Sequence, residues 1–276
     1  MIALGQLPPF SPALNRLIAS LASDDVSFAK IADLIEKDTA LAGNILRLVN
    51  SALYGLSGTV NSIRQAVALL GINKLRNTAL TMSVARMCNQ VKTPAGWSTA
   101  NFNQHSVGVA ILADLLAQKL PVEYAEGAFA AGLFHDLGLL LIALGLPEEY
   151  KQMSLLCQLN KQWTVEYEIE VLGMTHAELS AEALAHWKLP EPIQTGVRYH
   201  VNPNVDPTPV KNGQLTLSHI LSAADSYVKG KGIFVSLFEA PSESTDDALE
   251  QFGLGDRLPL LLTEFENQFT AIKAFF

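Results

Sequence analysis

Imidazole and carboxylate side chains occur in this sequence at positions where the surrounding pattern calls for burial. An unpaired charge is expensive inside a protein, so a buried group of this kind must be hydrogen-bonded or bind a metal. Nitrogen and carboxylate donors together suit iron, manganese, nickel or zinc, whereas magnesium prefers more oxygen donors. The candidate metal ligands are His105, His135, Asp136, His176, His200 and Asp225.

Two of these candidates, His135 and Asp136, are adjacent in the apolar run "AAGLFHDLGLLLIALGL". Small residues precede the doublet and leave room for another segment to approach. Gly138 is expected to cap the helix and to expose the doublet at its end. The run 127–146 has about the ~20 residues that a bilayer requires. A central aspartate would cost roughly 2.5–3.5 kcal/mol in a membrane, so we expect a buried helix instead.

The other candidates fall on the apolar faces of four further expected helices. His105 begins a stripe that continues at Val109 and Leu112, and Asp225 follows Leu221 on a second stripe. His200 completes a third face after Val197.

His176 follows Thr175 and precedes Glu178, which together match a capping box, so His176 is expected in a first turn. Each group has a plainer explanation, because a lone buried histidine is more often hydrogen-bonded than metal-bound, and Asp225 could pair with Arg198. Five separate inward-facing cases nevertheless favour one shared site. His186 and His219 do not share these faces.

Helical spacing of apolar residues runs through almost the whole chain, and no run alternates as a strand would, which predicts an all-α fold without a substantial sheet. Asp38 is expected to cap one helix and Gly71 to end another. A polar stretch with Pro94 and Gly96 suggests a seam. The expected parts are a helical half at 7–90, a second helical half at 91–235 with the candidate metal site, and a loop and closing helix at 236–276.

The composition favours a globular cytoplasmic protein. Of 276 residues, 49% are hydrophobic and 17% charged, which provides enough apolar material for a large core. Cys88 and Cys157 are far apart, so neither a disulfide framework nor a zinc ribbon is predicted, and no secretory leader is recognised. A net charge of -8 argues against nucleic acid as a partner. A helix-turn-helix at 63–83 is a minor alternative, because Leu75 and Leu80 look like core residues.

The order of the candidates resembles that of the HD superfamily of metal-dependent phosphohydrolases, including its HD-GYP branch, in "HSVGVA", "AAGLFHDLG", "RYH" and "AAD". The first half, with "LPPF" and "KDTALAGNILRLVNSA", and the later "HWKLP" are similar to the HDOD module, the HD-related output domain of bacterial signalling. The resemblance covers about residues 7–228. It implies a multi-helix HD-like bundle preceded by an N-terminal helical half.

The HD resemblance implies one or two metals on His105, His135, Asp136 and Asp225, with His176 and His200 as extra ligands, and a water activated against a phosphoester. His135 and Asp136 would then be catalytic. Three features depart from the hydrolases. Leu139 replaces a lysine, Tyr199 replaces the first of two paired histidines, and no GYP signature follows.

The HDOD resemblance implies a regulatory or scaffold protein of a signalling pathway, which contacts other signalling proteins and binds no membrane. Such a protein could act with or without a bound metal. Arg47, Asn50 and Tyr54 form a candidate contact surface, although Asn50 and Tyr54 could equally serve the fold. The alternative is an active phosphohydrolase for a nucleotide or cyclic dinucleotide. DNA binding is the least favoured function.

Overall fold

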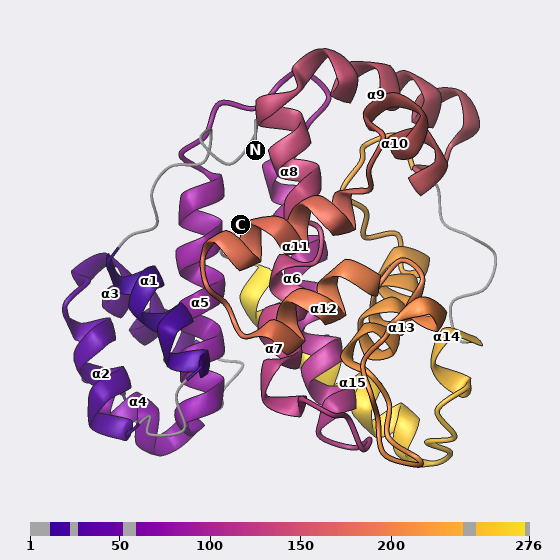
Figure 1. Ribbon diagram of the computed structural model, residues 1–276. Helices are drawn as coiled ribbons and strands as arrows, with labels where there is room; N and C mark the ends of the chain where they lie inside the picture. The colour runs from indigo at the N-terminus through magenta and orange to yellow at the C-terminus, as the bar shows by residue number, and fades with distance from the viewer. Residues whose placement is uncertain (1–11, 23–26, 52–58, 240–246, 274–276) are drawn as a thin grey trace. The chain divides into compact units, whose positions relative to one another are not determined.

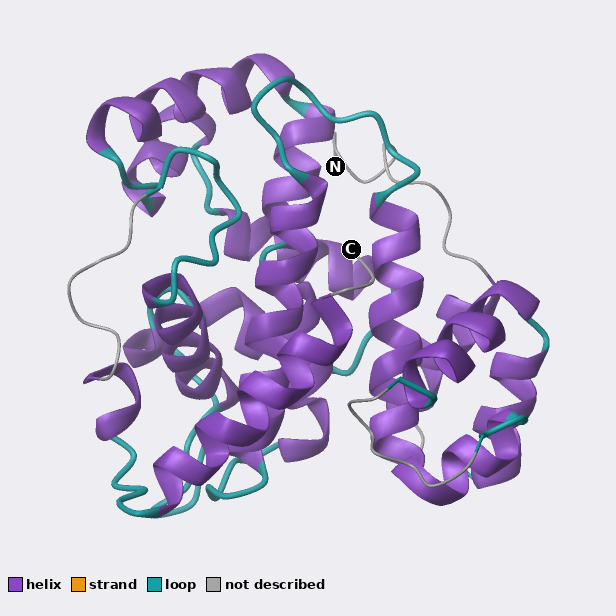
Figure 2. Ribbon diagram, turned by 180° about the vertical axis from the view of Figure 1, so that it is seen from behind, coloured by secondary structure: helices purple, strands orange, loops and turns teal. Residues whose placement is uncertain are grey.

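The computed structural model describes residues 12–22, 27–51, 59–239 and 247–273, and within these ranges the regular structure is helical. Figure 2 shows helices joined by loops, without a strand among the described residues. The β-type pairing recorded for them is a single parallel bridge between Val122 and Leu215. The all-α class predicted from the helical spacing is therefore confirmed.

The chain forms two compact units. One combines Pro9–Gln90 with Glu266–Phe276, and the other is Val91–Phe265. The separation after Gln90 falls next to the polar stretch expected as a seam, and residues 236–276 are divided between the two units.

The smaller unit, which contains Pro9–Gln90, is a helical bundle in which α5 contacts α1, α3 and α4, while α2 contacts α3 and α4 (Figure 1). Asp38 is the N-cap of α3, as expected, and its side chain accepts a 3.0 Å hydrogen bond from the Leu41 amide. The same carboxylate is paired with Arg86 of α5. Gly71, with φ of 79°, ends α4. The helices are α1 (Pro12–Ala19), the 3-10 turn η2 (Ser20–Ala22), α2 (Phe28–Glu36), α3 (Thr39–Val49), α4 (Ile63–Leu70) and α5 (Ile72–Cys88).

Asn50, one of the three expected partner-contact residues, supports the fold of this unit. Its amide nitrogen donates to the carbonyls of Leu46 and Val60, and its oxygen accepts from the Val60 amide at 2.7 Å. Arg47 is exposed and donates to Asn44. Tyr54 lies outside the described residues, so the contact surface stays a prediction.

The helix pair α4 and α5 occupies the segment considered for DNA binding. Leu75, Leu80 and Val84 are buried, as expected of core residues. Most of the other residues of α5 between Leu75 and Cys88 are also buried. A recognition helix needs an exposed face to enter a groove, and α5 offers little of one.

The larger unit contains all six candidate ligands. Helix α6 packs against α7 and α13, α11 packs against α8 and α12, and α12 also packs against α7 and α13 (Figure 1). The elements are α6 (Thr99–Ala117), η4 (Ala125–Gly127), α7 (Ala128–Phe134), α8 (Leu137–Gly145), α9 (Pro147–Asn160), α10 (Val165–Leu172), α11 (His176–His186), α12 (Glu191–Tyr199), η5 (Pro203–Val205), α13 (Leu217–Gly230), α14 (Asp247–Glu250) and α15 (Arg257–Lys273), the last of which continues into the other unit.

The segment Ala125–Gly145 is long and apolar enough to cross a membrane by length and composition. Within it, however, 94% of the most apolar 18-residue window is buried inside the protein. Helices α7 and α8 therefore have the burial of core helices, which agrees with the expectation drawn from the central aspartate.

Gly132 brings α7 close to α6. A Cβ atom at this position would lie 2.6 Å from the Cα and 2.8 Å from the backbone nitrogen of Ala110. Because both atoms belong to backbone, a side-chain rotation cannot relieve the clash. Glycine is thus required for the helix contact that carries His105 toward His135.

We predict that Gly132→Ala destabilises the larger unit by about 1–3 kcal/mol or more, the usual range for overpacking a core. Gly43→Ala is the matched control, because nothing lies within 4 Å of its Cβ position in α3. That change should stabilise by up to roughly 1 kcal/mol through helix propensity. Urea unfolding followed by circular dichroism measures both, and equal midpoints for the two variants would contradict the close approach.

Candidate metal centre

The His135-Asp136 doublet lies at a break between two helices. Helix α7 ends at Phe134, His135 is its C-cap, Asp136 is the N-cap of α8, and α8 begins at Leu137. The expectation that Gly138 caps the helix is wrong, because Gly138 lies inside α8. Its actual role is contact, since a Cβ atom there would lie 2.0 Å from the carbonyl oxygen of His176. The helix break turns both side chains of the doublet inward, and both are at most 1% exposed.

The six candidates come together from five places in the larger unit. The Nε2 atom of His105 in α6 lies 3.3 Å from Nε2 of His135, 3.2 Å from Oδ2 of Asp136 and 3.1 Å from Oδ1 of Asp225 in α13. The Nε2 atom of His135 lies 3.4 Å from the same Asp136 oxygen. Two atoms bound about 2.1 Å from one ion are on the order of 3–4 Å apart, so these separations suit donors that bind one shared metal ion.

A second group of donors faces the other oxygen of Asp136. The Nε2 atom of His176, at the start of α11, lies 3.1 Å from Oδ1 of Asp136, and Nε2 of His200 lies 3.8 Å from it. Asp136 is therefore shared by two neighbouring donor sets. We call these six residues the His/Asp cluster.

Each histidine of the His/Asp cluster is held by its other ring nitrogen. The Nδ1 atoms of His105, His135 and His200 donate to the carbonyls of Ile233, Gly132 and Val197 at 2.8, 2.7 and 2.6 Å. A carbonyl can only accept, so Nδ1 carries the proton and Nε2 presents a lone pair unless the ring is charged.

His176 is oriented by a carboxylate. Its Nδ1 lies 2.7 Å from Oε1 of Glu168 in α10, and its backbone amide donates to Oε2 at 2.7 Å. Glu168 is fully buried and also accepts from the indole nitrogen of Trp163 at 2.6 Å. A carboxylate behind a histidine is the usual support of a metal-binding imidazole, because it fixes the ring and raises its basicity.

Several buried atoms of the His/Asp cluster have no hydrogen-bond partner among the described residues. They are both carboxylate oxygens of Asp136, Oδ1 of Asp225, and Nε2 of His176 and His200. An unsatisfied buried polar atom costs about 1–3 kcal/mol, more if charged. Lone pairs that converge on one point are satisfied by a cation, so the cluster fits a divalent metal and could hold two.

Protons take the place of a cation in the metal-free protein. Burial lowers the pKa of His105, but the nearby carboxylates of Asp136 and Asp225 outweigh this effect and raise the pKa to about 9. Burial also lowers the pKa of His176, but the negative charge of Glu168 outweighs this effect and raises the pKa to about 10. Burial and the charges of His135 and His176 lower the pKa of His200 to about 3. The cluster thus mixes protonated and neutral rings.

Asp225 has a positive neighbour. Its Oδ2 atom accepts a 2.8 Å hydrogen bond from Nζ of Lys229, one helical turn later in α13, while Oδ1 faces the other ligands. Burial raises the pKa of Asp225, but the charge of Lys229 and the closeness of His105 hold it well below its usual range. The carboxylate therefore stays ionised, with Oδ1 directed toward the other members of the cluster.

Sequence reasoning missed Glu168, Trp163 and Lys229. A signal for Glu168 was available, because it lies between Val165 and Leu172 at helical spacing, a carboxylate on an apolar stripe like Asp225. Lys229 follows Asp225 at the i,i+4 spacing typical of ion pairs. Trp163 precedes α10 in a loop and carried no periodic signal.

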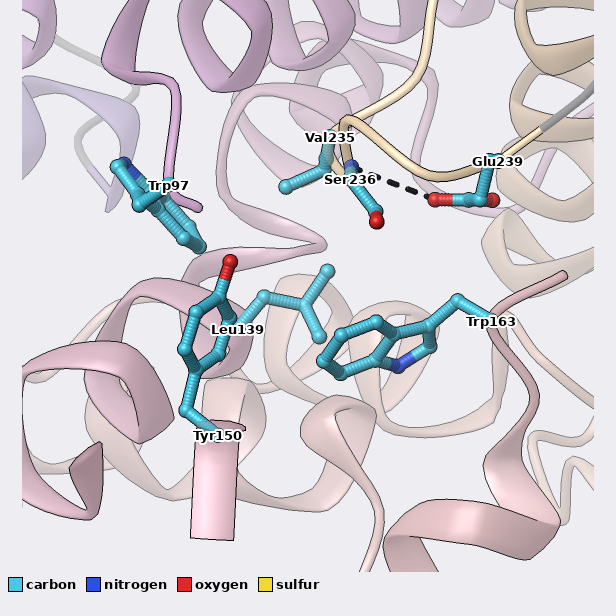
Figure 3. Close-up of a pocket in the computed structure, with 7 residues that line it drawn as sticks. All are labelled: Trp97, Leu139, Tyr150, Trp163, Val235, Ser236 and Glu239. Atoms are coloured by element: carbon cyan, nitrogen blue, oxygen red, sulfur yellow. Dashed lines mark hydrogen bonds between the residues drawn. The ribbon is translucent and has the colours of Figure 1, made fainter. Parts of the chain in front are cut away.

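Leu139, which replaces the expected lysine, is 7% exposed and lines a pocket beside the His/Asp cluster (Figure 3). The pocket walls also include Trp97, Tyr150 and Trp163. Its charged side chain is Glu239, a carboxylate. The residues that line this pocket therefore offer no cation to a phosphate.

Comparisons with known proteins agree with the fold. Residues 7–203 match the family model of the HDOD domain. An HDOD domain protein of unknown function from Geobacter sulfurreducens is 26% identical, with a TM-score of 0.78 over 97% of this chain and 91% of the other. A protein from Shewanella amazonensis, which is named a phosphohydrolase by inference only, is 23% identical. Its TM-score is 0.74 over 99% of this chain and 96% of the other. At this identity the comparison shows a similar fold alone.

Among curated proteins, an uncharacterized protein of Treponema pallidum is 25% identical over 204 residues. The alignment covers 72% of this chain but only 38% of the Treponema protein. The chain thus spans less than two fifths of the length of this relative.

We predict that metal binding releases protons and tightens with pH. In the metal-free protein the raised pKa values of His105 and His176 stabilise the fold below about pH 6.5, and this contribution is lost as the pH rises toward 9–10. A metal needs the same nitrogens unprotonated, so the rise in melting temperature caused by manganese or zinc should grow from pH 6.5 to 9. Calorimetry in buffers of different ionisation enthalpy would count the protons. A metal effect independent of pH would contradict this assignment.

We predict that Glu168→Gln weakens the ion held by His176 about 10–100-fold, the usual effect of losing a carboxylate behind a metal-binding histidine. The amide would also turn an N–H group toward donors that now meet a carboxylate. Glu166→Gln, an exposed change in the same helix, is the control and should bind like the wild type. Metal titration of both variants measures the difference, and equal affinities would show that Glu168 does not support a ligand.

Proposed function

The chain belongs to the HDOD family, and from this membership we propose that it is a cytoplasmic bacterial signalling module that acts through contacts with other signalling proteins. In this proposal the His/Asp cluster binds one or two divalent transition metal ions that stabilise the larger unit. Iron, manganese, nickel or zinc would suit its nitrogen and carboxylate donors.

The observation that supports a structural use of the metal is the enclosure of the donors. Each of the six cluster residues is at most 8% exposed. Leu139 lies where related hydrolases commonly place a phosphate-contacting lysine, so the cation that would stabilise a reacting phosphoester is missing. Loss of one such stabilising donor costs about 2.7–4 kcal/mol of activation free energy in other enzymes.

The chain's own residues have defined parts in this proposal. His105, His135, Asp136 and Asp225 would hold one ion, and His176 and His200 would hold a second together with Asp136. Glu168 and the backbone carbonyls keep each Nε2 atom turned inward, and Lys229 keeps Asp225 ionised. The bound ion would supply Lewis acidity and a fixed positive charge among these side chains.

Protein contacts remain the least defined part of the proposal. Arg47 is exposed on α3 and can take part in a contact surface with Tyr54. Asn50 is less suitable, because both ends of its amide bind backbone within its own unit.

Metal-dependent phosphohydrolysis of a nucleotide or cyclic dinucleotide is the second candidate function. The observation in its favour is that Asp136 faces two donor sets, one through each oxygen. Many enzymes that hydrolyse phosphoesters have two neighbouring metals, which stabilise the attacking and leaving oxygens. His135 and Asp136 would then be essential for turnover.

We predict a stoichiometric transition metal in the purified protein and its loss in His135→Ala and Asp136→Asn. Elemental analysis measures the content, and circular dichroism reports whether each variant is folded. His186→Ala is the control, because this exposed histidine lies outside the cluster and should leave the metal content unchanged. A folded wild type that stays empty after incubation with iron, manganese, nickel and zinc would refute the metal centre.

The same preparations separate the two functions. If the metal is structural, the metal-loaded wild type should release no phosphate or linear dinucleotide from a nucleotide panel, and both metal-deficient variants should melt at a lower temperature. Turnover abolished by Asp136→Asn and retained by His186→Ala would instead establish the hydrolase.

For the contact surface, Arg47→Ala and Tyr54→Ala should reduce the recovery of partner proteins in pull-down experiments without changing the melting temperature.

A further inference from the structure

Helices α9 and α10 form a hairpin in the larger unit, in which the two helices pack against each other (Figure 1). Helix α10 directs a carboxylate inward, because Glu168 is its buried residue. Glu168 holds His176 from this position. The apolar residues of α10 are therefore left at or near the surface, and Ile169 is 53% exposed.

Helix α9 also presents apolar side chains to solvent. Leu155 and Leu159 are 53% and 78% exposed. They are one helical turn apart, and Lys151 precedes Leu155 at the same spacing, so the three residues form one exposed stripe. The acidic residues of α9 lie in its first turn, before this stripe. Single exposed apolar residues are common on proteins, but three in one hairpin indicate a contact surface.

Charges of opposite sign border these apolar side chains. Glu166 and Glu170 lie on the exposed side of α10 together with Ile169, while Lys151 lies on α9. The ion pairs formed among the described residues include none of these three charged side chains. One helix therefore offers a cation and the other offers anions. A surface of this kind is complementary to itself, which is the property that a two-fold contact requires. We call Lys151, Leu155, Leu159, Glu166, Ile169 and Glu170 the hairpin surface.

We propose that the hairpin surface binds a second copy of the chain, with α9 of one copy against α10 of the other around a two-fold axis. Leu155, Leu159 and Ile169 form the apolar centre of this contact. Lys151 of each copy faces Glu170 of the other, so the same charge pair occurs twice. A second copy is the partner that fits, because it supplies both the apolar side chains and the charges that this surface leaves without a counterpart. The inference goes beyond the proposed function and does not depend on whether the His/Asp cluster holds a metal.

Sedimentation velocity over a range of protein concentrations measures this association. The wild type should form a reversible dimer that weakens as salt is added, because salt screens the charge pairs. Leu159→Ser should weaken the dimer about tenfold or more, since it removes a leucine from the apolar centre twice per dimer. Leu260→Ser is the matched control, because Leu260 of α15 is 73% exposed and lies outside the hairpin surface. This control should dimerise like the wild type.

Charge reversal tests the pairing of the two copies. Lys151→Glu and Glu170→Lys should each weaken the dimer about tenfold at low salt, because each variant places like charges opposite one another. An equimolar mixture of the two variants should recover the dissociation constant of the wild type, since opposite charges then meet at both pairs. Circular dichroism confirms that each variant is folded.

Three results would overturn the proposal. A wild type that stays monomeric at every concentration would show that the hairpin surface does not receive a second copy. A dimer unaffected by Leu159→Ser would place the contact elsewhere on the chain. A mixture of Lys151→Glu and Glu170→Lys that remains as weak as either variant alone would exclude the pairing. None of these measurements involves a metal or a signalling partner, so their failure is distinguishable from failure of the proposed function.

Discussion

The architecture of the larger unit depends on four imidazole rings that all turn Nε2 toward the same carboxylate. Each ring donates through Nδ1 to a fixed acceptor and therefore directs Nε2 toward Asp136. Lone pairs brought this close repel one another unless a proton or a metal lies between them. The helix contacts follow from this requirement, because α6, α11, α12 and α13 must each deliver one side chain to the break between α7 and α8. Glycine at 132 and at 138 permits that approach, since a Cβ atom at either position would strike backbone.

The sequence predicted the side chains better than the backbone that holds them. The search for ionisable residues on apolar faces identified five members of the His/Asp cluster, because burial of a charge on a helix leaves a periodic signal. Asp136 was added as the neighbour of His135 and through the resemblance to the HD superfamily. The same search would have identified Glu168 had it been extended to α10. By contrast, the carbonyls of Ile233, Gly132 and Val197 carry no residue-specific signal. The helix end was expected at Gly138 but lies at His135, because the apolar run through Phe134 and Leu137 gives no indication of where the interruption falls.

The centre and the pocket beside it both carry carboxylates. The His/Asp cluster collects donors for a metal cation, but Leu139 and Glu239 in the adjoining pocket supply no positive group for a phosphate. A phosphohydrolase relies on both parts together. The chain retains metal ligands beside a pocket whose lining is unsuited to phosphate. This combination agrees with a metal that would serve the stability of the fold. In that case the geometry of the ligands would be maintained by folding and not by turnover.

The spacing of the cluster residues along the sequence also bears on the unfolded chain. The outermost members, His105 and Asp225, are 120 positions apart, and His105 and His135 are 30 apart. A metal that holds such distant positions closes several loops at once, and it removes conformational entropy mainly from the denatured ensemble, as a disulfide is thought to do. With both cysteines free and buried, the chain has no covalent cross-link among its described residues. The His/Asp cluster would therefore serve this protein as a reversible cross-link, one that opens when the cation leaves.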